Sequence, residues 1–163
     1  MEFAFFASFL LLALFSLVDI GVYIYQRLQL ENAAQVASQT AWSMCEANYQ
    51  RPVTANCSGV QSAITSAAHT TSLGSAVSVT SVSEGYYCVN SSGALTLIGS
   101  TGTFGSPPTA QSSCGSGTWV NGSTPGDYVA VTVSYAYAPI FGAISLASLL
   151  TTPITKTSWM RVG

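Results

Sequence analysis

The pattern of apolar and polar residues divides the start of this chain into two parts. Residues 3–25 are apolar on nearly every helical face, and Asp19 is the one charged residue among them. A helix of about 20 apolar residues, rising about 1.5 Å per residue, matches a hydrocarbon core about 30 Å thick. The pattern therefore predicts that residues 1–26 form a helix that can span a membrane.

Residues 27–51 predict an amphipathic continuation of the same helix. No Gly or Pro interrupts the chain between Gly21 and Pro52, and Pro52 is expected to end the helix at Arg51. Apolar residues recur at spacings of three and four, which is typical of one buried helical face. They are Leu30, Ala33, Ala34, Ala37, Ala41 and Met44. Most of them are small, so another surface can approach this face closely.

Residues 52–163 predict a globular, β-rich head. Residues 58–71 are expected to form a short helix with Ser58 as its N-cap. Residues 76–83 alternate as a half-buried strand does, and residues 127–138 alternate most clearly of all. The remaining expectations are a hairpin of residues 86–90 and 94–98, a long loop at 99–117, a short helix or buried loop at 140–150, and a last strand at 154–162.

Together these elements predict an α+β fold. A long N-terminal hydrophobic α-helix carries a small antiparallel β-sheet head, which packs on the C-terminal half of the helix. The domain limits follow the same pattern: residues 1–26 as the apolar helix, residues 27–51 as its amphipathic continuation, and residues 52–163 as the head.

Charge is scarce in this chain. Only 6% of the 163 residues are charged and the net charge is −2, whereas about 25% is usual in soluble domains. The four basic residues are scattered along the chain, so no basic stripe is available to neutralise phosphates. Nucleic-acid binding is therefore not expected, and the Ser- and Thr-rich head suits an exported protein.

The four cysteines all follow the apolar helix, at Cys45, Cys57, Cys88 and Cys114. Closely paired ligands, which a zinc site usually shows, are absent, so no metal site is expected. An even number of cysteines in an exported head favours two disulfides. Three pairings are possible. We prefer Cys45–Cys57, which clamps the helix end to the turn after Pro52, and Cys88–Cys114, which closes a loop rich in Gly and Ser.

The N-terminus does not follow the pattern of a cleaved secretory signal. No Lys or Arg precedes the apolar run, and the run is longer than the apolar core of a signal peptide. A head with disulfides lies outside the cytoplasm, yet no basic residue marks the cytoplasmic side of the helix. The hypothesis that accommodates both facts is that a short basic leader has been removed and that Met1 is a mature start.

Several motifs resemble a known family. They are EFA at residues 2–4, VDIG at 18–21 and LENAA at 30–34, together with VTVSYAYAPIFG at 131–142 and WMR at 159–161. The chain thereby resembles the TadE/TadG-like pseudopilins of the tight-adherence, type IV pilus-like system. The resemblance covers residues 1–45 and 128–162. One departure is that this chain has its acid at residue 2, whereas family members place it later in the mature chain.

The resemblance implies a function as well as a pilin-like fold. It implies a structural subunit, a pilin or pseudopilin, that waits in the bacterial inner membrane and then enters an extracellular pilus through its hydrophobic helix. The partners implied are copies of itself or other pilins, the pilus assembly machinery and a prepilin peptidase. Whether the subunit is the major or a minor component stays open at this point.

Five residues are candidates for assembly. Glu2 would pair with an N-terminal amine, its own or a neighbour's, because an unpaired carboxylate among apolar helices is costly; the alternative is that Glu2 lies solvated among headgroups. Asp19 lies either at the outer membrane interface or between subunits packed in a filament. Phe3 and Phe6 belong to the apolar packing surface, and Gly21 allows close helix approach or a kink.

Other classes of function have less support in the sequence. His69 is the single histidine, and no nucleophile elbow or carboxylate pair accompanies it, so neither an enzyme nor a cofactor is expected. The alternative to a filament subunit is a single-span, membrane-anchored adhesin or binding module, whose head contacts a surface or a host.

Overall fold

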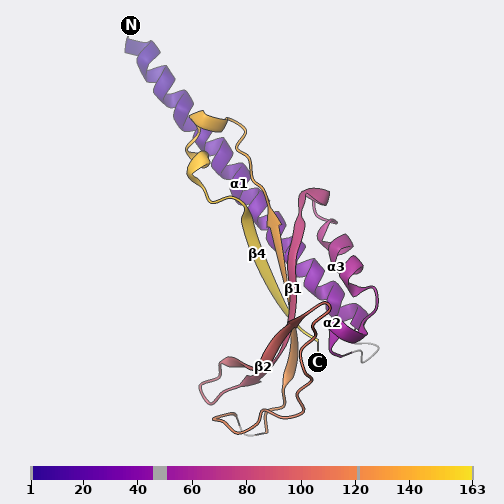
Figure 1. The fold of residues 1–163 in the computed structure, drawn as a ribbon. Helices are drawn as coiled ribbons and strands as arrows, with labels where there is room; N and C mark the ends of the chain where they lie inside the picture. Colours follow the sequence, from indigo (N-terminus) through magenta and orange to yellow (C-terminus); the bar gives the residue numbers. More distant parts are fainter. Residues whose placement is uncertain (1, 46–50, 121, 163) are drawn as a thin grey trace.

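One long helix forms the axis of the molecule, and an antiparallel sheet packs against its second half (Figure 1). The computed structural model describes residues 2–45, 51–120 and 122–162, without the side chains of residues 2–5, 8 and 143. The long helix is α1 (Glu2–Cys45), with 44 residues. The expected α+β fold, a long apolar helix with a small antiparallel sheet, is confirmed.

The sheet has four strands in the order β2-β1-β3-β4, and every neighbouring pair is antiparallel. The strands are β1 (Ser78–Val89), β2 (Leu95–Thr103), β3 (Gly126–Tyr135) and β4 (Ile154–Arg161). Two short helices follow α1, namely α2 (Val53–Asn56) and α3 (Val60–Ala68). Three 3-10 turns complete the described elements: η1 (Gly74–Ala76), η2 (Gly142–Ile144) and η3 (Leu146–Leu149).

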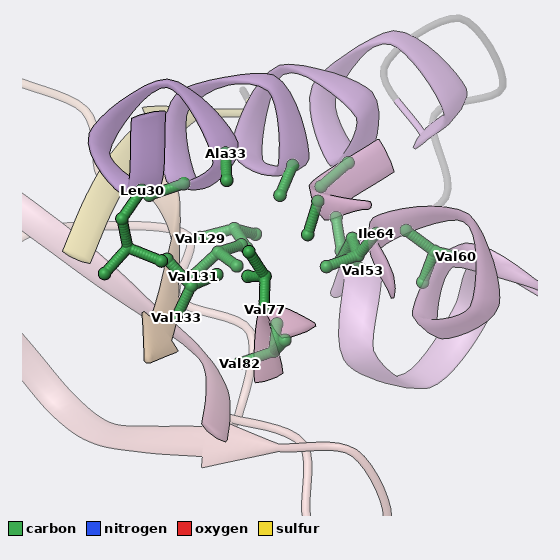
Figure 2. Close-up of a cluster of buried hydrophobic side chains, with 14 of the residues drawn as sticks. Leu30, Ala33, Val53, Val60, Ile64, Val77, Val82, Val129, Val131 and Val133 are labelled. Carbon is green, nitrogen blue, oxygen red and sulfur yellow. The ribbon is translucent and has the colours of Figure 1, made fainter. Parts of the chain in front are cut away.

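The core lies between the second half of α1, the sheet and α3. In Figure 2, Leu30 and Ala33 face Val129, Val131 and Val133 across this core. The alanine-rich face predicted from the sequence is buried, at 1% exposure or less: Leu30, Ala33, Ala34, Ala37 and Ala41. Small side chains on this face let the helix lie close to the sheet.

The predicted face was wrong at its last position. Met44 is 36% exposed, and Cys45 is fully buried in its place. Cys45 is held inward because it is bonded to Cys57, at an S–S distance of 2.07 Å. The second disulfide joins Cys88 of β1 to Cys114, in the connection between β2 and β3. Both are the pairs preferred from the spacing.

The hairpin of β1 and β2 is longer than the sequence suggested. Residues 76–83 and 86–90 were expected as two strands, but one strand, β1, runs through both segments. The register with β2 shifts between Glu84 and Tyr86, and this bulge interrupts the alternation of apolar residues. The predicted loop at 99–117 begins too early, because β2 continues to Thr103.

Two further boundaries differ from the prediction. The N-cap of α3 is Gly59 rather than Ser58, and its backbone is left-handed, with φ of 78°. A left-handed residue suits glycine, which has no Cβ to clash. Residues 140–150 were expected to form either a short helix or a buried loop. They contain the two 3-10 turns η2 and η3.

Candidate functional site

The first half of α1 carries a large apolar surface that the rest of the chain leaves uncovered. Phe6, Phe9, Leu10 and Leu17 are each between 67% and 74% exposed. Among the described residues, the stretch Phe9–Cys45 contains a window apolar enough to cross a membrane, with a mean hydropathy of 1.8. Only 11% of that window is buried in the molecule. Side chains of this kind normally have an apolar neighbour or lipid around them.

The predicted assembly residues are spread along this half of α1. Glu2 and Phe3 belong to the helix, but their side chains lie outside the description. Phe6 is 67% exposed. A Cβ built on Gly21 would meet no atom within 4 Å, so the chain's own packing does not require glycine there. The assembly roles of these residues stay predictions.

Asp19 has partners that the sequence did not suggest. Its side chain is completely buried, and its carboxylate accepts hydrogen bonds from the backbone N–H of Ile140 at 2.9 Å and of Phe141 at 3.2 Å. The Tyr137 hydroxyl donates to the Asp19 carbonyl at 3.0 Å. Within this chain, therefore, Asp19 holds the C-terminal part of the head against α1.

Residues 139–150, which we call the 139–150 segment, lie along the apolar half of α1 (Figure 1, yellow-orange). The rings of Phe15 and Phe141 stack with their centroids 4.5 Å apart. The Ser16 hydroxyl accepts a hydrogen bond from the Leu146 N–H at 3.3 Å. No local pattern indicated these contacts, because the partners are far apart in the chain; Ser16 and Leu146 are separated by 130 residues.

An apolar groove runs between α1 and the 139–150 segment, with a volume of about 530 Å³. Its walls are almost entirely hydrocarbon, since the one polar side chain among them, Ser16, already bonds to Leu146. The lining residues on α1 are Phe9, Leu12, Ala13, Ser16, Leu17 and Ile20, and those on the segment are Ile144 and Leu146.

Two acidic side chains are buried in the head, on neighbouring strands. Glu84 of β1 is 1% exposed, and its carboxylate accepts hydrogen bonds from the N–H of Val53 at 2.5 Å and of Thr54 at 2.7 Å. Asp127 of β3 is 2% exposed. Burial, and then the negative charge of Glu84, raise the pKa of Asp127 to about 8. Asp127 therefore keeps its proton at neutral pH.

The architecture defines a class of protein: a long, half-uncovered apolar helix joined to a compact α+β head that is tied by two disulfides. The model of the family described as TadE-like protein matches residues 1–39. The resemblance predicted from the sequence is thereby confirmed for this segment. None of the curated proteins or solved structures gives a significant match.

Proposed function

We propose that this chain is a structural subunit, a pilin or pseudopilin, of an extracellular Tad-type pilus. The observation that carries the proposal is the uncovered apolar surface of α1 at residues 6–18, within the segment that matches TadE-like proteins. In a membrane this surface contacts lipid, and in a filament it packs against the same surface of other subunits. The subunit thus waits in the bacterial inner membrane and leaves it on assembly.

The shape of the molecule agrees with this role. The sheet packs on the second half of α1, the 139–150 segment contacts one side of the first half, and the N-terminal end of α1 projects beyond the head (Figure 1). Helices of this kind can bundle in a filament core while the heads form the outer surface. By its resemblance to the family, the chain would be processed by a prepilin peptidase and handled by the pilus assembly machinery.

Glu2 provides the test of this proposal. We expect Glu2→Ala to abolish filaments or disturb their register, because the carboxylate no longer pairs with an N-terminal amine among apolar helices. The amount of subunit in the membrane fraction should not change. The measurement compares filaments sheared from cells, by immunoblot and electron microscopy, with subunit in the membrane.

Glu31→Ala is the matched control, since Glu31 is an exposed acid on the same helix, beyond residues 1–26, and its partner is Lys156 of the head at 3.0 Å, a surface ion pair of small energy. Normal filaments from Glu2→Ala would refute the role of Glu2. If the unaltered chain stays entirely in the membrane fraction and never enters sheared filaments, the alternative function, a membrane-anchored adhesin or binding module, replaces the proposed one.

A further inference from the structure

The 139–150 segment presents apolar side chains to its surroundings. Ile140, Ile144 and Leu146 are 64%, 58% and 65% exposed, and Leu149 is 81% exposed. No charged residue occurs between Asp127 and Lys156, so no charged side chain in this part of the sequence favours contact of the segment with water. Four exposed aliphatic side chains within eleven residues would be costly on a surface that meets only water.

The level of the segment along α1 indicates what surrounds it. It contacts Phe15, Ser16 and Asp19, which lie about 12 to 18 Å before Arg27 along an ideal helix. Arg27 is the first basic residue of the chain. Residues 3–25 rise about 33 Å, which is the thickness of a hydrocarbon core. A membrane that covers this stretch therefore also covers the 139–150 segment.

A shallower insertion, with only the residues before Phe15 in lipid, would leave a second apolar surface in water. Three apolar residues of α1 lie level with the segment or on its C-terminal side, namely Leu17, Val18 and Ile24. They are 67%, 43% and 52% exposed. Covering these side chains with acyl chains brings the 139–150 segment to the same depth.

Several backbone N–H groups of the segment have hydrogen-bond partners within the protein, as a position in the membrane requires. Irregular backbone at membrane depth needs protein partners for its polar groups, because no water is available there. The Asp19 carboxylate accepts from the N–H groups of Ile140 and Phe141, and the Ser16 hydroxyl accepts from that of Leu146. The Ser145 hydroxyl accepts from the Ala147 N–H at 3.1 Å. These polar side chains are buried, whereas the aliphatic side chains of the segment stay exposed: Ile140, Ile144, Leu146 and Leu149.

We propose that the 139–150 segment enters the lipid leaflet on the side of the head, with its aliphatic side chains among acyl chains and Asp19 as the positioning residue that holds it on α1. The head is then anchored at two points, by α1 and by this segment. The inference rests on the proposed function only in taking α1 as membrane-inserted before assembly.

Photo-crosslinking of the full chain tests this inference. Benzoylphenylalanine replaces Leu149 in one protein and Leu95, 51% exposed at the start of β2, in a control protein. Both are reconstituted at low density in vesicles of phosphatidylethanolamine and phosphatidylglycerol and then irradiated. We expect a covalent phospholipid adduct, seen as a mass increase, at a yield several-fold higher for position 149 than for position 95.

Asp19→Ala should lower the adduct yield at position 149 several-fold, whereas Val18→Ala, a change at an exposed neighbour, should not. Equal yields at positions 149 and 95, or crosslinks mainly to a second copy, would overturn the insertion. An unchanged yield in Asp19→Ala would overturn the positioning role of Asp19. Sheared filaments report on the proposed function separately, because they do not depend on where residue 149 lies in the membrane.

Discussion

At the scale of single residues, Asp127 is the side chain most out of place in the head. It is 2% exposed, and Glu84 on the next strand adds a negative charge. The same two acids, after burial itself, raise the pKa of Tyr86 to about 12. The surroundings of Asp127 and Tyr86 therefore favour the protonated form of both side chains.

The stability of the head should consequently fall as the pH rises from about 4 to about 8. Over this range the unfolded chain releases the Asp127 proton, since its pKa there is near the ordinary 3.8, while the folded chain keeps it up to about 8. The slope has an upper limit of about 1.4 kcal/mol per pH unit. Asp127→Asn should reduce this dependence, because the amide does not ionise.

Denaturant unfolding of the detergent-solubilised chain at pH 5 and pH 8 measures the effect by circular dichroism. Glu31→Gln is the control, because Glu31 is an exposed acid whose ion pair with Lys156, at 3.0 Å, lies at the solvated surface and should contribute little to stability. An unaltered chain that is equally stable at both pH values would contradict the prediction.

At the scale of elements, the small residues of α1 decide how closely the helix approaches the sheet and α3. Ala37 is completely buried within the face that also contains Ala33, Ala34 and Ala41. Ser38, beside them, shares a hydrogen bond of 2.9 Å with Ser158 of β4. A helix of average side-chain size could not take this position without moving away from the strands.

Ala37→Leu should therefore destabilise the head by about 1 to 3 kcal/mol, because the added carbon atoms have no space in the packed core. Gln35→Leu, on the exposed side of the same helix, should change the free energy of unfolding by about 0.5 kcal/mol or less. The comparison uses denaturant unfolding of both variants in detergent. A similar, small effect of the two changes would show that this face of α1 is not closely packed.

At the scale of the whole molecule, the two halves of α1 differ in their surroundings. The second half of α1 is packed in the core, whereas the first half is contacted by Tyr137 and the 139–150 segment. Gly21 lies where these two regions meet, and a Cβ built there would meet no atom of another segment within 4 Å.

Gly21→Leu should accordingly leave the head folded, and any change in its stability should be in the direction of a better helix. If neighbouring subunits approach closely at Gly21 in a filament, the larger side chain should lower the yield of sheared filaments. Asn32→Leu, an exposed change further along α1, is the control. An undiminished filament yield from Gly21→Leu, measured by electron microscopy, would exclude close approach at this position.

Much of this molecule could be predicted from local patterns. The long helix, its buried alanine face and the strand β3 follow from periodicities of 3.6 and two residues, which each segment carries within itself. The strand was predicted at 127–138 and ends earlier, at Tyr135. The preferred cysteine pairs also agree with the structure. The apolar character of residues 3–25 was visible in the same way, whereas the exposure of residues 6–18 is seen in the structure.

Tertiary structure alone decided where the acids lie. Asp19 meets the backbone of residues 140 and 141 across a separation of more than 120 residues, and Glu84 approaches Asp127 because two strands are neighbours in the sheet. The bulge that joins two predicted strands into β1 has the same origin. Periodicity is a property of neighbouring residues, whereas these contacts depend on how distant segments pack, so no local pattern could have indicated them.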